Sequence, residues 1–269
     1  MTLQILISTL DKGIDNVAQM MLPPHDDIGY LVSWQHSNDE EIALPHELDR
    51  NDVEVYNLEG RGISRNRNNC LRNASGDVLL LADDDCHYTH ERLQQVIDTF
   101  TQNPNVDIAT FQFHGEGSSK HYPTESFDLS SFPKGYFVSS IEIGLRRKSV
   151  QGKLWFNENF GLGTEIFHCG EENIFIEDAL ALGLKCKFFP ITIVDENDSS
   201  ICVKRDNEPG TLMAHGAIIH FYQPKTEYLR VALKAYRLWS NRDVPFFKAL
   251  KHMINGIKYA KAHPEIKNN

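Results

Sequence analysis

The chain has 269 residues, of which 41% are hydrophobic and 24% are charged, as in an ordinary globular protein rather than a disordered or fibrous one. It contains 27 Lys and Arg against 37 Asp and Glu, a formal net charge of −10, which argues against a nucleic-acid partner because phosphate binding needs a basic surface. The charge is uneven: residues 221–269 hold ten basic and three acidic residues, net +7, so residues 1–220 are net −17. We therefore expect an acidic main domain over 1–220 and a separate basic region over 221–269.

The cysteines and the apolar segments indicate the compartment. The five cysteines are odd in number and form no C-x-x-C pair, so we expect reduced thiols in a cytoplasmic protein, without a disulfide framework or a zinc site. The first apolar run stops at Asp11 and has no basic residues before it, unlike a signal peptide. No stretch approaches the roughly 18 apolar residues of a membrane span. Contact with a membrane surface stays open.

Short apolar runs alternate with helical patterns along the first two thirds of the chain. We expect strands over 3–7, 28–32, 53–58, 78–82, 106–113, 138–145 and 187–194. We expect helices over 63–74, from Thr89 as N-cap through Phe100, and over 174–182, 226–239 and 245–261. This alternation predicts an α/β fold with a mostly parallel central sheet.

Three consecutive carboxylates, Asp83, Asp84 and Asp85, follow the wholly apolar run 78–82. Ligands of open α/β sheets bind outside the carboxyl ends of the strands, where these residues are expected to lie. Adjacent carboxylates repel one another, and their oxygen atoms suit Mg²⁺ or Mn²⁺ shared with a substrate phosphate. The alternative is a solvated acidic turn that favours the N-terminus of the next helix.

An arginine-rich segment, Arg61-Gly62-Ile63-Ser64-Arg65-Asn66-Arg67-Asn68, lies upstream where a loop enters a helix. Arginines beside helix N-terminal N–H groups form a phosphate-binding arrangement, although an arginine-bearing helix face can also be simply solvated. Together with the acidic cluster across one strand, the segment indicates a metal–diphosphate pocket.

These segments carry a family resemblance. Residues 62–68, then Ala74-Ser75-Gly76-Asp77, then the strand that ends in Asp83-Asp84-Asp85 resemble, in order and spacing, the family 2 glycosyltransferases with the GT-A fold. The resemblance covers about residues 3–195. It implies a Rossmann-like α/β fold over 1–220 that binds a nucleotide sugar and carries out catalysis, followed by a C-terminal helical appendage.

The resemblance also implies roles for individual residues near the donor. Asp83, with Asp84, lies near the nucleotide ribose or base, and Asp85 ligates a divalent metal (Mn²⁺ or Mg²⁺) that bridges the diphosphate. The helix arginines, Arg65 first, lie near the nucleotide. We assign Thr9 and Gln35 to the same nucleotide site. Gln35 falls in the segment that replaces the acidic pair by which the family often reads the base; its amide can still hydrogen-bond a uracil, so the base stays open.

Gly170-Glu171-Glu172 resembles the family's G-E-D segment, with Glu172 in the place of the aspartate. The resemblance implies an inverting mechanism in which this carboxylate deprotonates the acceptor hydroxyl; Glu172 is the first choice for the base and Glu171 the second. The alternative is that both are first-turn acids that favour a helix. Some metal-dependent GT-A enzymes use a late histidine as a further metal ligand, which makes His220 a candidate.

The two expected C-terminal helices are basic and amphipathic. Leu229, Ala232, Leu233, Tyr236 and Trp239 form an apolar stripe beside Arg230, Lys234 and Arg237. Two interpretations stay open: a helical hairpin packed on the catalytic domain, or a surface over 226–261 that makes peripheral contact with an anionic membrane. Similar bacterial enzymes often act on lipid-carried acceptors.

The sequence thus predicts a metal-dependent inverting glycosyltransferase that moves a sugar from a nucleotide sugar, with UDP-sugar favoured, to a hydroxyl of a glycan or lipid-linked acceptor. The expected location is cytoplasmic, with a peripheral position on the inner face of the membrane. One alternative is a sugar-phosphate nucleotidyltransferase, but residues 8–13 lack the glycine-rich basic loop expected after its first strand. The other is a catalytically silent nucleotide-sugar-binding or scaffold protein of a polysaccharide complex.

Overall fold

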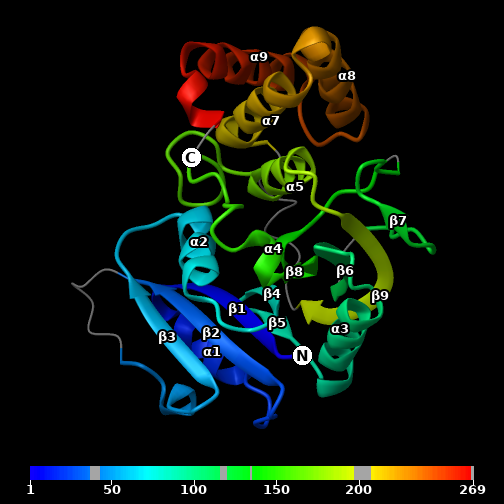
Figure 1. The fold of residues 1–269 in the computed structure, drawn as a ribbon. Helices are drawn as coiled ribbons and strands as arrows, with labels where there is room; N and C mark the ends of the chain where they lie inside the picture. Colours follow the sequence, from blue (N-terminus) through cyan, green and yellow to red (C-terminus); the bar gives the residue numbers. More distant parts are fainter. Residues whose placement is uncertain (37–42, 116–119, 134, 197–206, 268–269) are drawn as a thin grey trace. The chain divides into compact units, whose positions relative to one another are not determined.

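The computed structural model describes residues 1–36, 43–115, 120–133, 135–196 and 207–267 (Figure 1). The chain forms two compact units. The first comprises Met1–Arg61, Arg65–Trp155 and Asp178–Ser199, and the second comprises Gly62–Ser64, Phe156–Glu177 and Ser200–Asn269. Each unit is described by itself below.

The first unit is built on a mixed sheet. Its strands are β1 (Leu3–Leu10), β2 (Ile28–Gln35), β3 (Val53–Leu58), β4 (Val78–Asp83), β5 (Cys86–His87), β6 (Ile108–Gly115), β7 (Phe127–Asp128), β8 (Ile143–Arg146) and β9 (Cys186–Glu196), in the order β3-β2-β1-β4-β8-β6-β9-β5, with β7 also paired to β9. Strands β3, β2, β1 and β4 are parallel, as are β6 and β9. Strand β8 is antiparallel to both of its neighbours. The predicted α/β fold with a mostly parallel sheet is confirmed.

Helices cover both faces of the parallel part of the sheet. Ile5 and Ile7 of β1 point to the face that also buries Ile14 of α1 (Ile14–Met20) and Leu93 of α3 (His90–Gln102). The other face lies under α2 (Ile63–Asn73), where the Cys70 thiol donates to the Ile7 carbonyl at 3.6 Å. Because successive side chains of a strand alternate between faces, a strand covered on both sides must be apolar throughout. This accounts for the run 78–82, which is buried along its whole length.

Local sequence signals account for where several helices and strands begin. The Thr89 hydroxyl accepts from the Arg92 N–H at 3.3 Å and caps α3, as predicted. The strand predicted over 138–145 is shorter, because Ser139 and Glu142 form a capping box for a 3₁₀ turn (Ser140–Glu142) that precedes β8. A short helix, α4 (Arg147–Val150), follows β8. The other 3₁₀ turns are Asp11–Gly13, His46–Leu48, Pro224–Thr226 and Pro264–Lys267.

The second unit is helical. It contains the first residues of α5 (Glu171–Ala181), then α7 (Pro209–Tyr222), α8 (Glu227–Ser240) and α9 (Phe246–Ala262). Its core joins Leu212 of α7 and Val231 and Ala235 of α8 to Met253 and Ile257 of α9. The predicted helices over 226–239 and 245–261 correspond to α8 and α9, whereas α7 was not predicted. Helix α7 is apolar on nearly all sides, so it lacks the periodic pattern by which a surface helix is recognised.

Helices α7 and α9 cross at two glycines. A Cβ at Gly216 would lie 1.9 Å from the Met253 carbonyl oxygen, and one at Gly256 would lie 2.0 Å from the Met213 carbonyl oxygen. The backbones therefore touch at both positions, which only glycine allows. The division of the sequence at residue 220 falls within α7 and stays a prediction. In the parts of the chain that the structure describes, no helix has the length and hydropathy needed to span a bilayer.

Candidate active site

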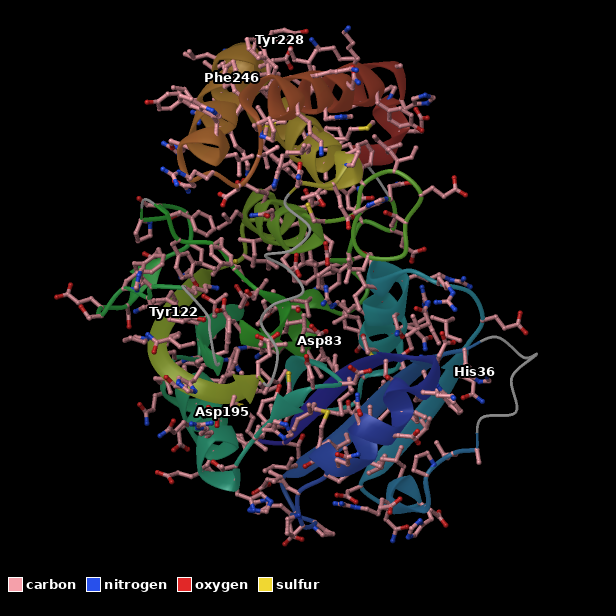
Figure 2. All side chains as sticks on the ribbon, turned by 180° about the vertical axis from the view of Figure 1, so that it is seen from behind. His36, Asp83, Tyr122, Asp195, Tyr228 and Phe246 are labelled. Carbon is pink, nitrogen blue, oxygen red and sulfur yellow. The ribbon has the colours of Figure 1, made fainter. Side chains whose placement is uncertain are left out.

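The parallel strands bring the predicted nucleotide-site residues to one edge of the sheet in the first unit. The register pairs Ser8 of β1 with Asp83 of β4, and Leu10 of β1 with Gln35 of β2. Thr9, Gln35 and Asp83 therefore lie at the carboxyl ends of three adjacent strands, and Figure 2 marks Asp83 there. This is the edge at which ligands of open α/β sheets bind.

Asp83 is held by two donors. Arg67 Nη2 lies 3.1 Å from its Oδ1, and the Ser140 hydroxyl donates to its Oδ2 at 3.2 Å. The Arg67 side chain is 5% exposed, so its charge needs an acidic partner. Of the helix arginines expected near the nucleotide, Arg65, the first choice, is exposed, whereas Arg67 contacts Asp83. The spacing could have identified Arg67, because it lies on the helix face of Ser64 and Leu71, which are both buried.

Asp84 is bonded to Thr9. The Thr9 hydroxyl donates to Asp84 Oδ2 at 2.6 Å. Burial raises the pKa of Asp84, and the hydrogen bond from Thr9 partly opposes this rise. Gly13 leaves room for the carboxylate, since a Cβ there would lie 2.0 Å from Asp84 Oδ2. The Thr9 carbonyl in turn accepts from the Asn66 amide at 3.0 Å, so the turn after β1 is fixed from both sides.

Asp85 is the carboxylate of this turn whose environment best suits a cation. Burial raises its pKa to about 6, and the neighbouring charges of Asp83 and Asp84 add to the effect. Its Oδ1 is buried and accepts no hydrogen bond within the described residues. Such an atom is costly unless a cation or a donor occupies the space beside it. Asp85 therefore fits a divalent-metal ligand.

Within the described residues, no further cluster of side chains completes such a coordination shell. The described residues contain no group of three or more His, Cys, Asp or Glu side chains that could hold a metal ion. Mg²⁺ is commonly bound through one or two carboxylates, with water and substrate phosphates as the other ligands. One carboxylate facing a diphosphate is compatible with that pattern.

Gln35 is buried, with 2% of its surface exposed, and its Nε2 has no acceptor among the described residues. The neighbouring Trp34 donates from Nε1 to the Asp11 carbonyl at 2.8 Å and stacks on His36 at 4.1 Å between ring centroids. The Asp11 carboxylate also binds Arg61 at 2.9 Å. An amide donor at the end of β2 is thus available for a carbonyl group, such as that of a nucleobase.

The second unit presents the other predicted carboxylates. Glu171 begins α5 and is 5% exposed; it packs against Gly161, where a Cβ would lie 3.0 Å from its carboxyl carbon. Glu172 lies in the same first turn and is only partly buried. The Gly170 carbonyl accepts from the Ile174 N–H at 3.1 Å and starts the helix. The N–H groups of a first turn favour an ionised carboxylate, the form a general base needs.

A glycine loop before α5 is anchored to the start of α2, also within the second unit. The Ser64 hydroxyl donates to the Phe160 carbonyl at 2.6 Å, and the Ile63 N–H donates to the Leu162 carbonyl at 2.9 Å. Gly161 has φ +107°, a backbone conformation that L side chains rarely adopt. This loop therefore determines where Glu171 and Glu172 can lie relative to the first turn of α2.

His220, the candidate metal ligand, lies in α7 of the second unit. Its Nδ1 is 2.6 Å from Glu227 Oε2, and Glu227 is also bonded to Lys261. One ring nitrogen is thus engaged with a carboxylate, and ligation of a metal by His220 stays a prediction.

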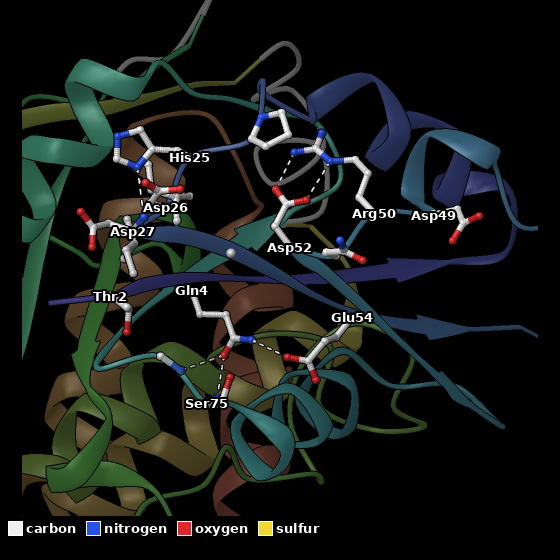
Figure 3. Close-up of a pocket in the computed structure, with 16 residues that line it drawn as sticks. Thr2, Gln4, His25, Asp26, Asp27, Asp49, Arg50, Asp52, Glu54 and Ser75 are labelled. Atoms are coloured by element: carbon white, nitrogen blue, oxygen red, sulfur yellow. Dashed lines mark hydrogen bonds and ion pairs between the residues drawn. The ribbon is translucent and has the colours of Figure 1, made fainter.

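A shallow hollow of about 700 Å³ lies at the opposite, amino edge of β1 and β2 (Figure 3). Several of its polar groups are paired with one another. Arg50 binds Asp52 through two hydrogen bonds, and Gln4 donates to Glu54 and accepts from the Ser75 N–H. The hollow is therefore separate from the carboxylate edge and shows no comparable unpaired group among the residues described.

The fold and this edge define an α/β protein with a candidate ligand site at the carboxyl ends of its strands, and comparison with known proteins defines it further. The profile of Glycosyl transferase family 2 matches residues 7–169. The chain belongs to this family and is a glycosyltransferase. No curated protein sequence matches it significantly.

Solved structures share the fold at low sequence identity. Residues 1–349 of TarS from S. aureus superpose with a TM-score of 0.58 at 15% identity, covering 93% of this chain and 81% of that one. The same protein in complex with UDP gives 0.57 at 16% identity, covering 96% and 81%. The mannosyltransferase PcManGT from Pyrobaculum calidifontis, in complex with GDP-Man and Mn²⁺, gives 0.54 at 13% identity, covering 97% and 75%. The similarity confirms the GT-A fold.

Proposed function

We propose that the protein is an inverting, metal-dependent glycosyltransferase that uses a UDP-sugar as donor. The single observation that carries the proposal is Asp85, a carboxylate with a raised pKa and an unpartnered buried oxygen, at the nucleotide edge of a family 2 fold. The structural relatives in complex with UDP and with GDP-Man and Mn²⁺ support both a nucleotide-sugar donor and a divalent cation.

In this proposal the donor site is formed by residues of the first unit. Asp85 holds Mn²⁺ or Mg²⁺, and the chemistry supplied with the bound cation is neutralisation of the charge on the leaving diphosphate. Asp83, fixed by Arg67 and Ser140, contacts the nucleoside. Thr9 orients Asp84, Gln35 donates to a base carbonyl, and the exposed Arg65 attracts the diphosphate.

The acceptor is activated by α5. Glu172 removes the proton from an acceptor hydroxyl while the oxygen attacks the anomeric carbon from the side opposite the diphosphate. The bond from that carbon to the diphosphate oxygen breaks, and UDP leaves with the electron pair. Glu171 is the second choice for this base. The acceptor is a hydroxyl of a glycan or of a lipid-linked sugar, and the enzyme acts in the cytoplasm, with 226–261 in peripheral contact with the inner face of the membrane.

The test combines donor binding with donor hydrolysis. Thermal shifts are measured with a panel of nucleotides and nucleotide sugars, with and without Mn²⁺, and slow UDP release is followed without acceptor. We expect Asp85→Asn to lower Mn²⁺-dependent release by about a hundredfold or more, while Asp98→Asn, on the exposed side of α3, leaves it unchanged. Full activity of Asp85→Asn would refute the metal site. Binding of nucleotide sugars without release of UDP, even with acceptors, would instead indicate a silent binding protein.

A further inference from the structure

Helix α8 leaves a row of large apolar side chains uncovered. Five of them are more than half exposed: Tyr228, Leu229, Leu233, Tyr236 and Trp239. Figure 2 labels Tyr228 on this helix. Soluble proteins rarely expose a contiguous apolar surface without using it for an interaction.

These side chains are not the packing face of the helix. At about 100° per residue they fall within roughly 140° of one side of α8. Val231 and Ala235, on another side, are fully buried against residues of α7 and α9. The hairpin therefore completes its core without the row, and the apolar stripe seen in the sequence lies on an exposed side of α8.

Basic side chains border the row. Arg230 and Arg237 are exposed on the adjacent side of α8. Helix α9 adds Phe247, which is 81% exposed, with Lys251 and Lys258 exposed on the same helix. The Lys261 ammonium lies 5.1 Å from the ring centroid of Tyr228.

Acidic residues are few and largely neutralised in this region. Residues 226–261 contain eight Lys and Arg against two Asp and Glu. One of the two acids, Glu227, is buried and bonded to Lys261 and His220. The exposed surface around the row is therefore positively charged.

We infer that the exposed side of α8, with Phe247 of α9, docks on an anionic lipid bilayer. Tyr and Trp rings favour the headgroup level of a membrane, where one part of the ring is apolar and the other meets water. The arginines and lysines then contact lipid phosphates. The inference specifies the peripheral location given in the proposed function and does not depend on the transfer chemistry.

Charge argues against a second copy of the chain as the occupant. A two-fold dimer places the same patch on both subunits, so the arginines that border the row would face those of the other copy. Like charges brought together across an interface oppose association. An anionic surface has the complementary charge.

The test uses the full chain and two kinds of vesicle, phosphatidylcholine alone and phosphatidylcholine with phosphatidylglycerol. We expect co-sedimentation only with the anionic vesicles, reduced by added salt, and a blue shift of fluorescence that is lost in Trp239→Phe. Each basic residue near an anionic surface contributes a factor of about five to partitioning, so Arg230→Gln with Arg237→Gln should weaken binding about 25-fold. Leu233→Glu should also weaken it.

Matched controls lie on the first unit. Leu182→Glu changes a leucine of similar exposure, and Lys148→Gln with Lys185→Gln removes two exposed charges; both should bind vesicles as the unchanged protein does. All variants should keep their circular dichroism and their rate of donor hydrolysis. Equal vesicle binding by Leu233→Glu and the unchanged chain would overturn the inference, as would a dimer in sedimentation equilibrium that Leu233→Glu dissociates.

Discussion

The hydroxyl of Thr9 donates a 2.6 Å hydrogen bond to Oδ2 of Asp84, and so joins the end of β1 to the acidic turn that follows β4. The bond favours the ionised form of a carboxylate whose pKa is raised by burial. The charge state of the turn therefore depends on a residue about 75 positions away in the sequence.

Replacing Thr9 tests this link. Thr9→Val keeps the shape of the side chain but removes the donor, so the pKa of Asp84 should rise further and the acidic limb of the kcat/KM profile should move to higher pH. A hydrogen bond to a charged group contributes about 1.5–3 kcal/mol, so the acidic limb should move by about one to two pH units. Thr9→Ser retains the hydroxyl and is the control. Superimposable profiles for the two variants would contradict the prediction.

The pair of Arg67 and Asp83 should behave as one energetic unit. A double-mutant cycle with Arg67→Met, Asp83→Asn and both together should give a coupling energy of about 1–3 kcal/mol in unfolding free energy. Asp83→Asn alone should be the most destabilised variant, because it leaves the buried Arg67 charge without this acidic partner, whereas the Asp83 side chain is 35% exposed. Arg72→Met, an exposed arginine of the same helix, should show no coupling to Asp83. Additive effects would mean that the 3.1 Å contact contributes nothing.

The two glutamates of α5 differ in exposure, so their substitutions should have different effects on turnover and on stability. Glu172→Gln should lower kcat for transfer by about a thousandfold, as loss of a general base does, with the melting temperature and UDP binding retained. Glu171→Gln changes a buried side chain beside Gly161, so it should lower the melting temperature. If Glu171→Gln loses turnover with its stability intact and Glu172→Gln stays active, the roles are reversed.

Much of the fold could be predicted because the apolar pattern of a strand shows how many of its faces are covered. Residues 78–82 are apolar at every position, and only a strand covered on both faces needs this. Helix α7 could not be predicted, because its apolar residues surround the whole helix and its glycines matter only for contact with α9. A contact between two backbones leaves no periodic trace in the sequence.

The sequence could predict which segments form the candidate site, but not which contacts join them. Asp83, Asp84 and Asp85 follow directly from a strand that ends at the ligand edge, and Gln35 follows in the same way from β2. Arg67 was expected near the nucleotide as the second choice after Arg65, but its pairing with Asp83 could not be predicted because the two residues lie on different elements. The Thr9–Asp84 bond also joins distant segments, so the sequence could not predict it. Whether Arg65 and His220 act as expected stays a prediction.

Gly161 offers a test of the loop before α5. Gly161→Ala adds a Cβ 2.6 Å from Ile63 and 3.0 Å from Glu171, at φ +107°. Backbone strain and the clash should destabilise the protein by about 2–4 kcal/mol and lower kcat. Gly152→Ala is the matched control, because Gly152 has φ +75° and nothing within 4 Å of its Cβ position; it should cost only about 1–2 kcal/mol. Equal losses in the two variants would show that the contacts of Gly161 have no effect.

The lowered pKa of Glu227 predicts that the stability of the helical unit depends on pH. Burial raises the pKa of Glu227, but the hydrogen bonds from Lys261 and His220 outweigh it, so the pKa lies below the ordinary 4.5. A carboxyl group with a lowered folded-state pKa stabilises the fold above its unfolded pKa and loses this effect as the pH falls through the folded value. Glu227→Gln should therefore melt roughly 2–6 °C lower than the unchanged protein at pH 7.

The difference between the two melting temperatures should stay constant down to about pH 5 and shrink below pH 4.5. Glu265→Gln is the control, since Glu265 is paired with His263 on the surface, where an ion pair contributes little. A constant difference at all pH values would assign the effect of Glu227 to packing instead of charge.

The contact of α7 and α9 at Gly216 and Gly256 has a mechanical consequence. At these two points no side chain separates the helices, so a change of rotamer cannot make room for one helix to slide along or roll over the other. Helix α8 is bonded to this frame through Glu227, which contacts His220 of α7 and Lys261 of α9 at once. A load applied to α8 is therefore carried by the three helices together, and it reaches the loop before α5 through the packing of Ala214 and Ala217 of α7 against Phe160 and Phe167.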